Sequence, residues 1–309
     1  MTITTIKAGQ IVEAATLLLQ REVVLPRLVW TMADANFRGA LDDTVTLRVP
    51  AVLSSRTRVM RSSDPLVADN LAETSVPVKL ATHIYNLLNI TDEELTLDIV
   101  DFARQVLAPQ MRAVAEGMED VIADALAGAT VGVGQTLTFD GTSTTGEGAY
   151  QMLVKAGAVL NNLKVPRANR VFLAGTNAEA ALLNDDKLVK VNESGTTDAL
   201  REATITRVAG FTVVGSLAIG PNEAYAFDRN AVAFANVAPA LPDGATMKAR
   251  VALDGLALRY IRDYNPTNAT GPVDRSLVDS FVGAASVEQG GFNHRLVKIT
   301  FDGTGPVSA

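Results

Sequence analysis

The chain has 309 residues, of which 48% are hydrophobic and 20% charged, ordinary values for a folded protein that buries one or more sizeable cores. It contains no cysteine, so neither a disulfide framework nor a thiolate metal site is possible. Its formal net charge of −7 excludes a clamp that grips nucleic acid through a basic face, and the absence of any run of about 18 apolar residues excludes a helical membrane span.

Residues 1–40 are expected to form an N-terminal arm. Their apolar residues make one short amphipathic stripe between Ile11 and Leu19 and then a run from Val23 to Trp30. A segment with so little apolar surface cannot bury a core of its own, so we expect it to dock on another surface. The chain's own body and a second subunit both remain open as that surface, and Trp30 is the contact candidate for the second.

Residues 41–88 are expected to form a long projecting β-hairpin. Apolar and polar residues alternate over 44–49 and again over 76–85, which is the period of half-buried strands. The connection over 54–75 is polar and serine-rich, and structureless loops of that length are uncommon inside compact domains. An isolated two-stranded ribbon is only marginally stable in water, so the hairpin needs a neighbour to lie on. The alternative is a solvated surface loop.

The charged residues of this hairpin are the candidates for contact with a neighbouring subunit. Its arginines could instead bind phosphate, but ion pairs with a second subunit are favoured, because the chain is acidic and carboxylates lie close by in the sequence. The candidates are Arg48, Arg56, Arg58, Arg61, Asp64, Asp69 and Glu73.

Residues 93–128 predict a long amphipathic spine helix. Apolar residues recur at spacings of three and four, while the opposite face is charged. Thr91 and Glu94 have the spacing of a capping box ahead of the helix, and its last residue is a glycine, as is common at helix ends. Pro109 removes one bond of the helical ladder, so we expect the helix to kink or split near Ala108.

A glycine-rich strip over 129–148 leads into an α/β unit, and from Met247 the pattern is again that of strands. We expect these later strands to return and pair along the spine. The final residues, 303–309, are expected to be disordered. The two helices of the α/β unit are predicted by capping-box pairs, Thr144 with Glu147 and Thr176 with Glu179.

Patterns that carry catalysis or metal binding are missing. The two histidines, His83 and His294, each stand without a local motif, and a lone histidine in a strand is usually structural. The pairs Asp42-Asp43 and Asp185-Asp186 predict turns or helix caps rather than a metal or acid/base pair. The glycine-rich stretch 128–134 lacks the GK[ST] ending of a phosphate-binding loop. We therefore expect a structural protein with no catalytic residue, no metal and no cofactor.

Three short stretches and the order of elements carry a family resemblance. The stretches are NITDEEL (89–95), AGFTVVGS (209–216) and DGLALRYIRDYN (254–265). With the order of arm, hairpin, spine helix, α/β unit and returning strands, the chain resembles the major capsid protein of tailed bacteriophages, which has the Hong Kong 97-type fold. The likeness covers nearly the whole chain, although each motif is short.

The resemblance implies an α+β Hong Kong 97-like fold and a structural role. Hexamers and pentamers of the chain would form an icosahedral head that encloses double-stranded DNA without sequence-specific binding and without a membrane. A separate scaffolding protein, a portal and a decoration protein are the further partners implied, with assembly in the host cytoplasm and a final location in the virion. The implied parts are an N-terminal arm (1–40), an extended loop (41–88), a peripheral domain (89–145 and 246–302), an axial domain (146–245) and a tail (303–309).

Three other readings remain open. An encapsulin-type nanocompartment shell has the same fold and differs in loading a protein cargo. A soluble α/β enzyme would place its substrate site around Gly175, Asn177 and Asp185. The third interpretation is a tail or decoration protein. The long spine helix argues against it, because mostly β folds are expected for such proteins.

Overall fold

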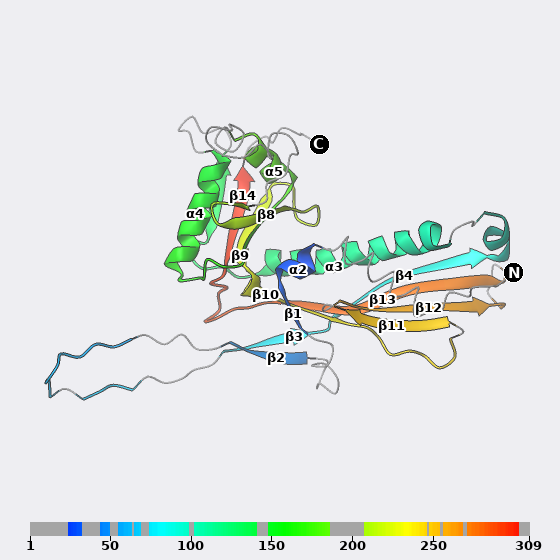
Figure 1. The fold of residues 1–309 in the computed structure, drawn as a ribbon, viewed down its shortest axis with the longest axis horizontal. Coiled ribbons are helices and arrows are strands. Elements are labelled where there is room, and N and C mark those ends of the chain that lie inside the picture. Colours follow the sequence, from blue (N-terminus) through cyan, green and yellow to red (C-terminus); the bar gives the residue numbers. More distant parts are fainter. Residues whose placement is uncertain are drawn as a thin grey trace.

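The described residues form three parts. Figure 1 shows a sheet with the long helix α3 along it, a second sheet with its own helices near one end of α3, and a hairpin that projects away from both. No helix in the described part of the chain is long and apolar enough to cross a membrane. The computed structural model describes residues 24–32, 44–49, 55–63, 65–68, 74–98, 102–140, 148–185, 207–245, 247–253, 256–267 and 271–302. Outside these ranges lie most of the predicted arm, the predicted tail, and Asp64, Asp69 and Glu73.

The spine helix is α3, Ala108–Gly128. It is shorter than the predicted helix, because the turns ahead of it, η3 (Glu94–Asp98) and η4 (Ala103–Leu107), are π-helical. Pro109 lies in the first turn of α3, where a missing backbone N–H is tolerated. The helix type changes at Ala108, but η4 runs directly into α3, so the predicted split is wrong and the predicted kink stays a prediction.

The first sheet lies against α3. Its strand order is β1, β10, β13, β12 and β11, and β4 pairs with the other edge of β13. Met118, Ile122 and Leu126 of α3 are fully buried in the core they share with this sheet. The predicted return of the chain along the spine is confirmed for β11 to β13. The strands are β1 (Trp30–Met32), β4 (Thr82–Thr91), β10 (Val232–Val237), β11 (Met247–Leu253), β12 (Leu256–Asn265) and β13 (Val273–Ser286).

The second sheet has the order β5, β14, β9, β6, β8 and β7 and is covered by α4 and α5. We expected the last strand, β14, beside the spine; it lies instead between β5 and β9, because Val297, Ile299 and Phe301 pack into the core under α4. The elements are β5 (Thr136–Asp140), α4 (Ala149–Asn162), β6 (Arg170–Ala174), α5 (Thr176–Leu183), β7 (Arg207–Val208), β8 (Phe211–Gly215), β9 (Glu223–Asp228) and β14 (Leu296–Asp302), with the short 3-10 turn η5 (Arg229–Ala231) leading to β10.

Two buried amide side chains hold the sheets together where the chain crosses between them. The Nε2 of Gln135 donates to the carbonyl oxygens of Asn293 and Leu296, each at 2.7 Å. The Nδ2 of Asn293 donates to the carbonyl of Ala231 at 2.8 Å, and its backbone N–H donates to Thr130 O at 2.7 Å. Because buried, fully bonded polar groups are costly to break, this crossing fixes the two sheets to each other.

The hairpin is rooted on the first sheet. Its strands β2 (Thr44–Val49) and β3 (Thr74–Lys79) pair antiparallel, and the predicted alternation holds for their buried residues. The return strand was expected to be continuous, but it is interrupted: β3 ends at Lys79, and a separate strand, β4, begins at Thr82 in the first sheet. At this break the chain crosses β13 so closely that a Cβ on Gly283 would lie 2.0 Å from Lys79 O.

The first described residues pack on the chain's own body. Leu25 of α2 (Leu25–Leu28) is fully buried against the spine, and β1 pairs in parallel with β10. Of the two surfaces left open for the N-terminal arm, residues 24–32 therefore use their own chain. Trp30 remains 37% exposed on β1.

The helix caps differ in part from those predicted. The box of Thr91 and Glu94 is present, since Thr91 N donates to Glu94 Oε2 at 2.9 Å and Glu94 N donates to Thr91 Oγ1 at 3.3 Å. Thr176 and Glu179 form no such box: Gly175 takes the N-cap position of α5, and no side chain caps it. The third predicted box, at 144 and 147, lies outside the described residues.

Candidate subunit-contact surfaces

The outer part of the hairpin ends in a turn, residues 59–62. We call this turn the arm tip, and from here on "the arm" means the projecting hairpin and not the N-terminal arm of residues 1–40. Ser62 N donates to Val59 O at 3.2 Å, and Arg61 has a φ of +65°. Met60 stands beside Arg61 and is 89% exposed, and Val59, Leu66 and Val67 are exposed as well. Figure 1 shows this segment far from both sheets. Exposed apolar side chains gathered on one segment mark a contact surface.

The predicted contact residues fall into separate places. Arg56, Arg58 and Arg61 are brought together on the exposed outer hairpin, whereas Arg48 is exposed on β2 near the root and Trp30 lies in the body. Asp64, Asp69 and Glu73 belong to the part of the chain that the structure does not describe. The use of all these residues in subunit contacts stays a prediction.

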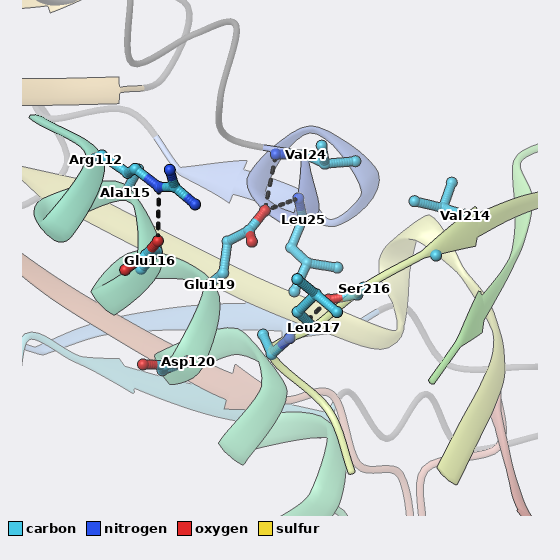
Figure 2. A pocket seen from close by; sticks show the side chains of 12 residues that line it. Val24, Leu25, Arg112, Ala115, Glu116, Glu119, Asp120, Val214, Ser216 and Leu217 are labelled. Atoms are coloured by element: carbon cyan, nitrogen blue, oxygen red, sulfur yellow. Dashed lines mark hydrogen bonds and ion pairs between the residues drawn. The ribbon is translucent and has the colours of Figure 1, made fainter. Parts of the chain in front are cut away.

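A second surface, which we call the spine groove, lies between α2, α3 and the connection from β8 to β9. It encloses about 440 Å³. Figure 2 shows its two walls, with carboxylates of α3 on one side and Val214 and Leu217 on the other. Leu217 is 91% exposed at the rim. Twelve residues line the groove: Val24, Leu25, Arg112, Ala115, Glu116, Glu119, Asp120, Val214, Gly215, Ser216, Leu217 and Ala218.

The spine groove is acidic. Glu119 is occupied, because its Oε1 accepts from the backbone N–H groups of Val24 at 2.9 Å and Leu25 at 3.1 Å. Glu116 forms an exposed ion pair with Arg112, 3.0 Å from Nε to Oε1. Burial raises the pKa of Asp120, and repulsion from the carboxylates of Asp124 and Glu116 raises the pKa further. Three carboxylates face one guanidinium, so the groove favours a cation.

Sequence reasoning missed this groove. Its walls come from three segments far apart in the chain, around Val24, around Glu116 and around Leu217, and only the fold joins them. One signal was present in the sequence: Glu116, Asp120 and Asp124 recur every four residues and so line one side of a helix. Like charges at that spacing repel one another and destabilise the helix, so a row of them is unusual on a helix face that contacts only water.

His83 contacts an ion pair on the first sheet, and its own side chain is 44% exposed. Its Nε2 lies 2.9 Å from Oδ2 of Asp279, whose fully buried carboxylate also accepts from Arg259 Nε at 2.9 Å. The imidazole ring packs against the rings of Tyr85 and Phe281. The positive charge of Arg259 balances the negative charge of the Asp279 carboxylate. The contacts of Asp279 with His83 and Arg259 join β4, β13 and β12, which fits a structural role for His83. Among the described residues, no group of three or more acidic, histidine or cysteine side chains could hold a metal ion.

The residues named for an enzyme reading are engaged in structural contacts. Asp185 Oδ2 accepts from Tyr150 N at 2.9 Å and so caps α4, as predicted for a cap residue. Asn177 Nδ2 donates to Asn222 Oδ1 at 2.6 Å. A Cβ on Gly175 would lie 2.3 Å from Gly220 O, so this position needs glycine for close backbone packing.

The sequence matches no family model and no curated protein. The structure, however, is similar over nearly its whole length to solved shell structures. A structure of Mycobacterium phage Che8 superposes with a TM-score of 0.61 at 17% identity, over 91% of this chain and 91% of that one. The capsid of cyanophage P-SCSP1u gives 0.62 at 10% identity, over 98% of this chain and 91% of that one. The chain has the Hong Kong 97-type capsid fold.

A virus-like particle from Pyrococcus furiosus has a related structure, with a TM-score of 0.51 at 11% identity over 93% of this chain and 96% of that one. The predicted α+β class is thereby confirmed together with the fold. At identities this low, the likeness extends to the fold and not to individual residues.

Proposed function

We propose that the chain is a major capsid protein, which assembles with copies of itself into the hexamers and pentamers of an icosahedral phage head. The observation that carries the proposal is the projecting hairpin, with its buried base and exposed tip. It is rooted on a buried cluster at β10 and β13, yet its tip exposes apolar side chains and arginines to water. A ribbon of this kind is stabilised only by a neighbour, and many such contacts repeated by symmetry stabilise a closed shell.

The contents of this head would be double-stranded DNA, held without sequence-specific contacts. A net charge of −7 supports this, because a subunit that repels phosphate on average does not retain the genome through its whole surface. By resemblance to tailed phages, a separate scaffolding protein, a portal and a decoration protein would be the other partners. The subunit would assemble in the host cytoplasm and end in the virion.

A nanocompartment shell of the encapsulin type is the second candidate. It is favoured by the likeness to the Pyrococcus furiosus virus-like particle, which has the same fold at a lower TM-score. The contents of purified particles separate the two candidates: nucleic acid supports a phage head, and a folded protein cargo supports a nanocompartment.

The test is electron microscopy and light scattering of the chain expressed alone and together with a candidate scaffolding protein. Closed particles, or rings that close when the scaffold is added, are expected. Replacing residues 55–73 by a short glycine-serine linker is expected to leave the body folded, with an unchanged thermal transition, and to abolish closed particles. Normal shells from this deletion would refute the role of the arm, and a chain that stays monomeric under every condition would refute the proposed function.

A further inference from the structure

We propose that the spine groove receives the arm tip of a second copy of this chain, with Arg61 against Glu116 and Asp120, and Met60 against the apolar wall at Leu217. The inference rests on the proposed function, because it names the surface through which one subunit holds the next. Resemblance to other shells does not carry it. It follows from the exposure, charge and placement of two surfaces in this chain.

The arm tip has the properties of an inserted knob. Met60 is almost fully exposed, and Arg61 beside it adopts a left-handed backbone conformation that is unfavourable for a residue other than glycine. The bond from Ser62 N to Val59 O holds the turn in this form. A preformed turn loses little conformational entropy on binding, which favours insertion of Met60 and Arg61 as a unit.

The groove has the matching properties. Leu217 and Val214 offer an apolar wall, and Glu116 and Asp120 offer charge. Burial, and after it repulsion from the carboxylates of Asp124 and Glu116, disfavours the ionised form of Asp120 and raises its pKa. An incoming guanidinium would relieve that repulsion as well as add an ion pair. A volume of about 440 Å³ suits a few side chains rather than a whole strand.

The charges of the two surfaces are complementary. The described segment 55–63 contains three arginines and no acidic residue, although the chain as a whole is acidic. The groove presents three carboxylates and one guanidinium. Complementary charges of this kind speed the encounter and fix the register between partners.

This chain's own arm tip does not reach the groove, so an arm tip placed there belongs to a second copy. Figure 1 shows the outer hairpin pointing away from α2 and α3, which form the groove. Its root cannot swing round freely, because Lys79 crosses β13 in close contact with Gly283. The groove itself is held in shape, since its two walls belong to α3 and to the second sheet, which Gln135 and Asn293 join rigidly.

Charge reversal tests the pairing. Arg61→Glu and Asp120→Arg are each expected to lower the association constant between copies by about 10-fold or more, and the double variant is expected to recover most of that loss. Arg112→Gln is the matched control, because it removes the guanidinium of the same groove and should strengthen association. Assembly is followed by light scattering, and circular dichroism verifies that each variant is folded.

Disulfide trapping tests the geometry independently, because the chain has no cysteine of its own. Met60→Cys combined with Leu217→Cys is expected to give covalent ladders of several copies on non-reducing gels of assembled particles. Met60→Cys combined with Val133→Cys, an exposed position outside the groove, is the control and should give none. Wild-type-like assembly of Arg61→Glu, no recovery in the double variant, or equal ladders from both cysteine pairs would overturn the docking site while leaving shell formation intact. Failure of the wild-type chain to assemble would overturn the proposed function instead.

Discussion

Gly283→Ala tests whether the hairpin is anchored by the close crossing at its root. The added Cβ would lie 2.0 Å from Lys79 O, 2.8 Å from Lys79 C and 3.2 Å from Leu80 Cα. All three are backbone atoms, so no rotamer change can relieve the clash. Real Cβ contacts stay above 3.0 Å, so the crossing chain must move by at least 1.0 Å or β13 must bend.

The expected result is a loss of stability of about 1–3 kcal/mol, the usual effect of overpacking a well-packed contact. The sign is informative, because alanine in a strand interior is otherwise better than glycine by about 0.5–1 kcal/mol. The cost should fall on the small cluster of Leu47, Val78 and Ala235 under the hairpin, which is separate from the two larger cores.

Thermal melts and hydrogen exchange of the unassembled subunit provide the assay. Amides of β2 and β3 should lose protection, while those of β6 and β9 in the other sheet should keep theirs. Gly128→Ala is the control, since its Cβ would meet no atom within 4 Å. A Gly283→Ala variant as stable as wild type, with the hairpin amides still protected, would show that the crossing is looser than the geometry requires.

Two further predictions concern single carboxylates. Asp120→Asn should stabilise the unassembled subunit at neutral pH by about 0.2–0.5 kcal/mol for each of its two like-charge neighbours, Glu116 and Asp124. Because the folded-state pKa of Asp120 is raised, this gain in stability should shrink as the pH falls and vanish below pH 3.8. Urea titrations across that pH range check the expected trend. A gain that grows on acidification would contradict the sign. Asp185→Ala should lower the stability by about 1 kcal/mol and speed hydrogen exchange in the first turn of α4, because Tyr150 N loses its acceptor. Asp185→Asn keeps an acceptor oxygen and should retain most of the stability. Equal losses of stability from both variants would refute the capping role.

The sequence predicted features that depend on neighbours along the chain. Alternation in 44–49 identified the buried side of the hairpin, and the spacing of Thr91 and Glu94 identified a cap that the structure contains. Pro109 coincides with a change from π- to α-helix rather than with the predicted split, because it lies in the first turn of α3, where its missing N–H is tolerated.

Features that depend on the neighbour across space could not be predicted in this way. The alternation of Val297, Ile299 and Phe301 gives a strand one apolar face but does not say which sheet needs it, and β14 was assigned to the wrong one. The spacing of Thr176 and Glu179 predicts a cap at Thr176, whereas Gly175 fills that place because Gly220 O approaches too closely for a side chain. The spine groove and the amide crossing at Gln135 likewise combine segments that are distant in sequence.

The separation between a buried root and an exposed tip has a genetic consequence. A substitution confined to the arm tip leaves the cores intact, so the altered subunit should reach normal abundance and still enter mixed rings. Each altered copy then fails to hold one neighbour, and when altered and normal copies are made together, most rings contain at least one faulty contact. Lesions at the tip should therefore be dominant over the normal chain, whereas lesions in the cores should be recessive, because unfolded chains are removed before they meet a partner.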